Sequence, residues 1–224
     1  MQAGQIPIPR RFSDRAEAGR TLGESLAKYG GRDDAVVLAL ARGGVPVGFE
    51  IARALSVPLD VFVVRKLGVP GQEELAFGAI ASGGTRILNQ DVIRHLGLAS
   101  DAIDAVSEHE RRELARRELL YRGERPDRDL AGSIVILVDD GLATGASMRA
   151  AIAAVRVQRP AKIVVAVPTA ALEIYTALSA EVDELVCPLR PEDFYSVSLW
   201  YDRFEQVSDD QVRRLLETAR TEAE

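Results

Sequence analysis

Short runs of valine, isoleucine, leucine and alanine recur along this 224-residue chain. Strict alternation of apolar and polar residues, which marks a strand with one solvent-exposed face, is missing from them. They therefore predict strands that are buried on both faces, as in a parallel sheet. The runs lie at residues 35–40, 59–64, 134–138, 162–167 and 184–186.

Stretches with helical periodicity separate these runs. The predicted helices span residues 14–29 (capped by Ser13), 48–55, 100–121, 147–158 and 208–221 (capped by Ser208). Strands that alternate with helices predict an α/β fold with a mostly parallel sheet flanked by helices. No repeat or low-complexity linker divides the chain, so residues 1–224 are expected to form a single domain.

Composition narrows the classes of function. The net charge of −6 argues against a general nucleic-acid binder, and no apolar run is long enough to span a membrane. The first residues lack the apolar core of a secretory signal, and Cys187 is the only cysteine. These features predict a cytoplasmic protein that binds neither nucleic acid nor membrane.

The run at 134–138 leads directly into Asp139 and Asp140, and then into a loop of small and hydroxyl residues. A helix is expected to start after this loop, and the free N–H groups of a helix N-terminus, preceded by glycine, form a natural phosphate site. Carboxylates repel phosphate, so the two acids are better suited to accept hydrogen bonds from sugar hydroxyls. Together these features describe a ribose 5-phosphate site at the carboxyl end of a central strand.

Other interpretations explain less of this motif. A P-loop requires the pattern GxxxxGK[ST], which is absent. A phospho-receiver domain carries its acid pair after the first strand, whereas this pair comes late in the chain. Capping of a turn or helix accounts for one aspartate but not for two followed by TGAS.

The motif ILVDDGLATGAS (136–147) resembles the signature of the type I phosphoribosyltransferases. LALARGGVPVGFEIA (38–52) resembles the family's pyrophosphate loop, and VVRKLGVPGQEELAFGAIASGG (63–84) its second strand and flexible lid. PLRPEDFYSVSLWYDRF (188–204) is similar to the tail of a bacterial subgroup whose acceptor is undefined.

The resemblance implies an enzyme that transfers the phosphoribosyl group of 5-phosphoribosyl 1-pyrophosphate (PRPP) to a nitrogenous acceptor, a base or an amine, and releases pyrophosphate. The cofactor would be Mg²⁺, held mainly by the substrate and not directly by protein side chains. The implied catalytic residues are Arg42, Lys66, Asp139 and Asp140.

By the same resemblance, Asp139 and Asp140 would hold the ribose hydroxyls. The 5′-phosphate would lie on Ala143, Thr144, Gly145, Ala146 and Ser147, and the pyrophosphate on Ala41, Arg42, Gly43, Gly44 and Lys66. A non-proline cis peptide is expected near Ala41–Arg42. From the residues alone, the alternatives are an ordinary surface turn for Arg42 and a solvated strand end for Lys66 or Arg65.

Residues 68–88 would form the lid, with Glu73 or Glu74 near the substrate, although a plain surface hairpin fits the same residues. Residues 1–30 and 188–204 would form a small hood over the acceptor. Its aromatic residues Phe194, Tyr195, Trp200 and Tyr201 could stack on a flat base or simply fill the core of the hood. Surface positions are expected for His95 and His109, and a buried one for Cys187.

Acceptor identity is left open by the motif. Ala143 stands where 6-oxopurine enzymes of the family carry an acid, which disfavours a hypoxanthine or guanine acceptor. Two other functions use the same site: a non-catalytic regulator that senses PRPP or nucleotides, and a phosphorolytic or hydrolytic enzyme acting on a phosphoribosyl compound. A homodimer is also compatible with the resemblance.

Overall fold

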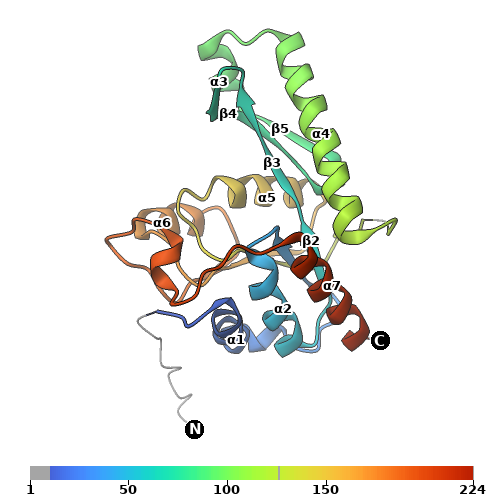
Figure 1. Ribbon diagram of the computed structural model, residues 1–224, viewed down its shortest axis with the longest axis vertical. Coiled ribbons are helices and arrows are strands. Elements are labelled where there is room, and N and C mark those ends of the chain that lie inside the picture. The colour runs from blue at the N-terminus through green and yellow to red at the C-terminus, as the bar shows by residue number, and fades with distance from the viewer. Residues whose placement is uncertain (1–10, 126, 224) are drawn as a thin grey trace.

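A computed structural model describes residues 11–125 and 127–223 of the chain (Figure 1). Its centre is a five-stranded parallel sheet with strand order β2-β1-β6-β7-β8. The strands are β1 (Ala35–Leu40), β2 (Leu59–Phe62), β6 (Ile134–Val138), β7 (Lys162–Ala166) and β8 (Glu184–Val186). The predicted α/β fold with a parallel sheet is therefore confirmed.

Helices cover both faces of this sheet. Successive residues of each strand point to opposite faces, so neighbouring residues of one strand pack against different helices. On one face, Val37 and Ile136 pack with residues of α1 (Arg15–Ser25) and α2 (Gly44–Leu55). On the other face, Leu38 and Leu137 pack with residues of α5 (Ala146–Val157) and α6 (Leu172–Ser179). The last helix, α7 (Asp209–Ala223), packs against α2 and β2.

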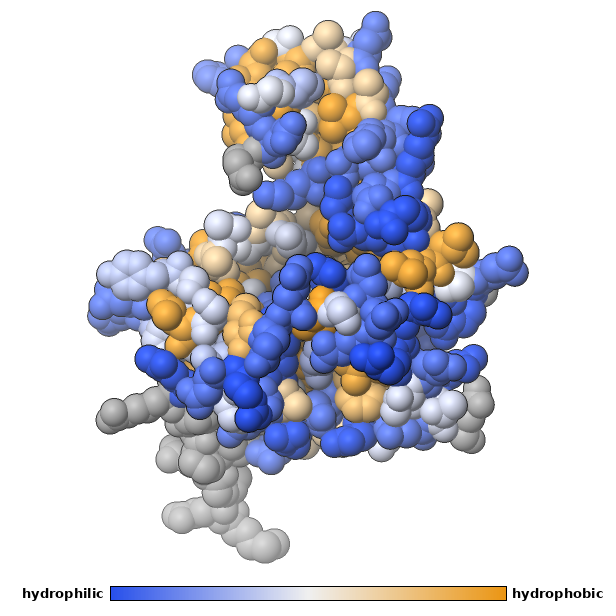
Figure 2. Space-filling view, viewed as in Figure 1, coloured by the Kyte–Doolittle hydropathy of each residue, from blue (hydrophilic) through white to orange (hydrophobic). Residues whose placement is uncertain are grey.

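A second, three-stranded antiparallel sheet stands away from the first. It consists of β3 (Val64–Val69), β4 (Gln72–Ala81) and β5 (Thr85–Leu88), and is followed by α3 (Gln90–Leu96) and α4 (Ser100–Arg122). We call residues 64–122 the arm. It forms the upper lobe in Figure 2, and its buried Leu67, Phe77, Ile80 and Leu114 belong to an apolar cluster that continues into the body of the protein.

The arm corrects one strand prediction. The single strand predicted at residues 59–64 is in fact two strands, because the chain leaves the parallel sheet after Phe62 and starts the arm at Val64. Within residues 68–88, β3 and β4 form a hairpin that β5 extends, and this arrangement is compatible with both the lid and the plain surface hairpin.

Several helix boundaries also differ from those predicted. Asp14, not Ser13, caps α1, because its Oδ1 accepts a hydrogen bond from the Glu17 N–H at 3.0 Å. Helix α2 begins at Gly44 and not at residue 48, directly after the glycine-rich loop. The predicted cap at Ser208 is confirmed by a 3.2 Å hydrogen bond from the Gln211 N–H. Across the described ranges 11–125 and 127–223, no helix combines the length and apolar character needed to cross a membrane.

Candidate active site

The acid pair lies at the carboxyl end of β6. The backbone N–H of Asp140 donates a hydrogen bond to Oδ1 of Asp139 at 2.9 Å, which holds the Asp139 side chain against the Asp140 backbone. Burial and the neighbouring Asp140 carboxylate raise the pKa of Asp139 well above its usual range. Burial also raises the pKa of Asp140, although the guanidinium of Arg15 acts in the opposite direction. The site thus holds two carboxyl groups whose ionised forms are destabilised by burial.

The glycine-rich loop, residues 41–44, lies directly against these acids. The register of β1 and β6 ends with Ala39 opposite Val138, so the segments that follow both strands meet at one edge of the sheet. A β-carbon added to Gly43 would lie 2.1 Å from Oδ2 of Asp140, and one added to Gly44 would lie 2.6 Å from the carbonyl oxygen of Val138. No side chain fits at either position. The peptide between Ala41 and Arg42 is cis, as the resemblance predicted.

Arg42 belongs to the same cleft as the acids. This open cleft has a volume of about 380 Å³ and is lined by Arg15, Arg42, Gly43, Asp140, Phe204, Gln206 and Val207. Nη1 of Arg42 lies 3.7 Å from Oδ1 of Asp209, the first residue of α7. The structure therefore brings Asp140 next to Arg42 and Gly43, although Asp140 lies far from them in the sequence.

The loop after the acids, residues 143–147, leads into α5. Gly145 is the N-cap, with φ of +70°, a conformation that glycine adopts without steric cost. The side chains of Ala143, Thr144, Ala146 and Ser147 are exposed, and the Ala146 N–H donates to Oγ1 of Thr144 at 3.4 Å. Because the first N–H groups of a helix have no partner within it, this loop can receive an anion, as its sequence predicts.

Lys66 and Arg65 lie elsewhere, on β3 of the arm. Nε of Arg65 pairs with Oε2 of Glu110 on α4 at 2.6 Å. Lys66 is exposed and lines a cleft between β3 and α4 that also includes Glu73 and His109. Neither basic residue lines the cleft of Arg42 and Asp140. The side chain of Glu74 lies outside the described part of the chain.

One residue of the site, Arg15, was missed in the sequence. It is the first residue of α1, and its Nε and Nη2 donate hydrogen bonds to Oδ2 of Asp140 at 2.9 and 2.8 Å. Its partner Asp140 is 125 residues away, so no neighbouring residue indicates the contact. A basic residue in the first turn of a helix, where acids are favoured, was the one available signal.

Residues 188–207, which we call the aromatic segment, connect Arg15 to the rest of the site. Tyr201 is 4% exposed, and its hydroxyl donates to the backbone oxygen of Asp140 at 2.7 Å. The rings of Phe194 and Trp200 are stacked, with centroids 6.3 Å apart, whereas Tyr195 is 84% exposed. Phe12 packs on Tyr201, so the described part of the predicted hood does come together; residues 1–10 lie outside the described residues.

The three remaining candidates, His95, His109 and Cys187, have the surroundings that the sequence predicts. His95 and His109 are solvent-accessible in α3 and α4. Cys187 is buried, and burial raises the pKa of its thiol to about 12, which makes it a poor nucleophile.

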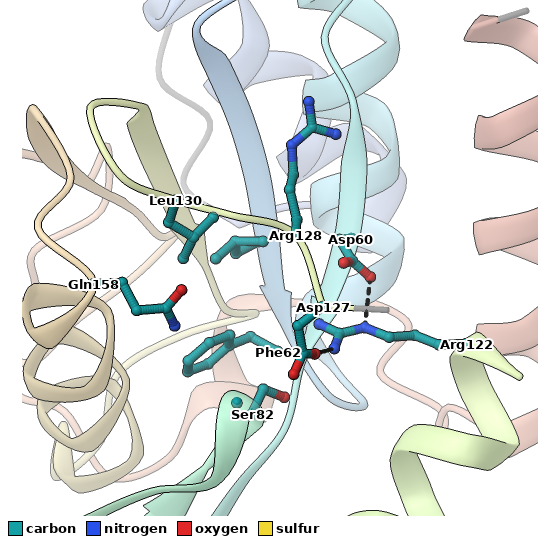
Figure 3. A pocket seen from close by; sticks show the side chains of 10 residues that line it. Asp60, Phe62, Ser82, Arg122, Asp127, Arg128, Leu130 and Gln158 are labelled. Carbon is teal, nitrogen blue, oxygen red and sulfur yellow. Dashed lines mark hydrogen bonds and ion pairs between the residues drawn. The ribbon is translucent and has the colours of Figure 1, made fainter. Parts of the chain in front are cut away.

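The small cavity in Figure 3 is a different place, at the base of the arm. Arg122, whose side chain is 6% exposed, donates there to Oδ1 of Asp60 at 2.9 Å and also pairs with Asp127. The cavity measures about 10 Å³, room for about one water. We interpret the ion pairs of Arg122 at this cavity as a structural connection between α4 and β2, and not as part of a substrate site.

Comparison with known proteins agrees with this geometry. The family model described as "Phosphoribosyl transferase domain" matches residues 14–197, and the chain belongs to this family. A protein of Mycobacterium tuberculosis (strain H37Rv) named "Putative phosphoribosyl transferase" is 47% identical over 208 residues, which cover 93% of this chain and 47% of that protein. The chain thus spans about half the length of the curated relatives it matches.

A solved structure is also similar. The crystal structure of the protein TT1426 from Thermus thermophilus superposes with a TM-score of 0.81 at 42% identity, covering 92% of this chain and 97% of that one. The likeness therefore extends over the arm and the aromatic segment as well as the parallel sheet.

Proposed function

We propose that this protein is a Mg²⁺-dependent phosphoribosyltransferase that uses PRPP as donor and a nitrogenous base or amine as acceptor. The observation that carries the proposal is the contact between two motifs. Gly43 of the loop 41–44 lies against the carboxylate of Asp140, and Arg42 lines the same open cleft. A ligand with a ribose on the acids and a pyrophosphate on the loop would fit this arrangement.

Each group has a role in the proposed transfer. The acids accept hydrogen bonds from the ribose hydroxyls and favour the positive charge that develops on the sugar as pyrophosphate leaves. Loop 143–147 binds the 5′-phosphate. The fork of Arg42 suits the oxygens of the departing pyrophosphate. Such a reaction requires positioning and charge stabilisation more than an activated protein nucleophile.

The protein groups present are compatible with Mg²⁺ carried by the donor. Mg²⁺ is commonly bound through one or two carboxylates together with substrate phosphates. Within residues 11–125 and 127–223, no group of three or more His, Cys, Asp or Glu side chains is placed to hold a metal ion. In this proposal the ion rests mainly on oxygens of PRPP, where it neutralises part of their charge.

The acceptor and the second cation complete the proposal. The proposed acceptor hood consists of residues 1–30, of which 11–30 are described, and residues 188–204, which include the stacked Phe194 and Trp200. Residues 68–88 of the arm are the proposed lid, and Lys66 would reach the pyrophosphate when the lid closes over the donor. A lid that excludes water would protect the reactive sugar from hydrolysis.

The first test is binding of the donor. PRPP with Mg²⁺ should raise the melting temperature of the protein, and Asp140→Asn should remove most of that rise, because a neutral amide accepts weaker hydrogen bonds from the sugar. No rise in the parent protein would refute the donor assignment.

A screen for pyrophosphate release from PRPP across purines, pyrimidines and small amines then tests the transfer itself. Release with one class of acceptor supports the enzyme. Binding of PRPP without release for any acceptor would support the alternative function, a PRPP-sensing regulator.

A further inference from the structure

The guanidinium of Arg15 contacts three different groups in the candidate site. Besides its two hydrogen bonds to Asp140, its Nη1 donates to the backbone oxygen of Glu205 at 2.9 Å. Its Cζ lies 3.8 Å from the centroid of the Phe204 ring, a close cation–π contact. The side chain is 11% exposed. Such a fully engaged arginine has little freedom to move.

Arg15 donates hydrogen bonds to only one of the two carboxylate oxygens of Asp140. Nε and Nη2 of Arg15 both donate to Oδ2, and no side-chain or backbone group of the other described residues donates a hydrogen bond to Oδ1. Gly43 closes the other side of Oδ2, since an added β-carbon would overlap it. The carboxylate is therefore confined between a guanidinium and a backbone, with Oδ1 left to accept a further hydrogen bond.

We propose that Arg15 is a positioning residue of the donor site, which holds Asp140 so that Oδ1 faces a ribose hydroxyl and which links this acid to the aromatic segment. The inference rests on the proposed function, because it assumes that Asp140 binds the ribose of PRPP. It adds a residue outside both sequence motifs. It also provides a physical connection between the donor acids and the segment assigned to the acceptor.

Charge gives Arg15 a second effect on the same acid. The charged and titratable groups around Asp140 are Asp139 from β6, Arg15 from α1, Arg42 from the loop 41–44 and Tyr201 from the aromatic segment. Burial raises the pKa of Asp140, and Arg15 opposes that rise. Removal of Arg15 should therefore raise the pKa further and leave Asp140 protonated at a higher pH, when its neutral carboxyl group accepts a weaker hydrogen bond from the ribose hydroxyl.

The experiment compares Arg15→Gln and Arg15→Lys with a matched control, Arg20→Gln. Arg20 lies on the same helix, is largely exposed and only approaches Glu50 at 3.8 Å. The first measurement is the titration of the Asp140 carboxyl carbon by ¹³C NMR without ligand, with the signal assigned through Asp140→Asn. The second is the affinity for PRPP with Mg²⁺ across the same pH range.

We expect the Asp140 titration midpoint to move to higher pH in Arg15→Gln, less in Arg15→Lys, and not at all in Arg20→Gln. Affinity for PRPP at pH 7 should fall about tenfold in Arg15→Gln, as expected for loss of charge-assisted hydrogen bonds. If Arg15→Gln does not fold, Arg15→Lys decides the matter, since one ammonium cannot reproduce the fork on Oδ2.

Unchanged midpoints in the Arg15 variants, or an equal shift in Arg20→Gln, would overturn the inference. An unchanged PRPP affinity in Arg15→Gln, with the parent binding PRPP, would also overturn it. If the parent does not bind PRPP at all while the midpoint still moves, the failure lies in the proposed function and not in the coupling between Arg15 and Asp140.

Discussion

Two glycine-containing loops follow neighbouring strands of the parallel sheet, and their glycines are required for different reasons. In loop 41–44, Gly43 has φ of −61°, which any residue can adopt, but a β-carbon there would meet Asp140 at 2.1 Å. In loop 143–147, Gly145 has φ of +70°, and the atoms nearest to its added β-carbon are side-chain atoms of α6, at 3.0 Å or more. Gly43 is required because the backbone there lies against Asp140, and Gly145 is required because the backbone there has a positive φ.

This difference separates the functions of the loops. Loop 41–44 is in contact with the acids, so any change in it also moves Asp140. Loop 143–147 has exposed side chains and presents the N-terminus of α5, so its geometry depends mainly on its own backbone. We therefore expect substitutions in the two loops to affect donor binding unequally.

The largest effect should come from Gly43→Ala. The new methyl group would displace the Asp140 carboxylate, and we expect PRPP affinity to fall on the order of a hundredfold, the scale on which an ångström of misplacement acts in an enzyme site. Stability should fall by only about 1–3 kcal/mol, as is typical of overpacking. Calorimetric titration with PRPP and Mg²⁺, together with denaturant unfolding, measures both quantities.

Gly30→Ala is a matched control, because Gly30 also has a negative φ, of −64°, and its β-carbon would lie 3.2 Å from the nearest oxygen, far from the acids. It should leave PRPP affinity unchanged. If Gly43→Ala binds PRPP as tightly as Gly30→Ala does, then closeness to Asp140 is not what the site requires of Gly43.

A smaller and more selective effect is expected from Arg42→Ala. Loss of its charge-assisted hydrogen bonds should weaken binding of PRPP about tenfold, while binding of ribose 5-phosphate, which has no pyrophosphate, should change less than about twofold. Arg53→Ala, on the exposed side of α2, serves as the control. Equal losses for the two ligands would mean that Arg42 does not bind the pyrophosphate.

The parallel sheet was predictable because its strands come from short apolar runs of the sequence, of which β1 and β6 are buried at every position. Strands β1, β6 and β8 begin and end at the predicted residues. Helix α4 of the arm was also predicted, but the antiparallel sheet of the arm was not, because β3 and β4 are partly exposed and contain Gly68 and Gly78, which weaken a strand pattern. The break after Phe62 is a change of sheet, and no local residue marks it.

The residues of the candidate site also differ in how well the sequence predicts their position. Asp139, Asp140 and loop 143–147 are contiguous with a strand, so sequence alone predicts their position. Arg42 and Gly43 reach them only through the register of β1 and β6, and Arg15 only through the packing of α1 and the aromatic segment. For Gly145, the sequence predicts a glycine that lets an anion approach, whereas the structure assigns it first to the left-handed N-cap of α5.

The smallest effect on donor binding should therefore follow Gly145→Ala. Alanine at φ of +70° costs about 1–2 kcal/mol of stability, but its methyl group would lie closest to Ile174 and Leu178, whose side chains can adjust. Gly97→Ala is the matched control, because Gly97 has φ of +60° and open space around it. Both variants should lose similar stability in denaturant unfolding, with PRPP affinity kept within about threefold. A loss in Gly145→Ala as large as that in Gly43→Ala would remove the contrast between the loops and would make Gly145 part of the phosphate contact itself.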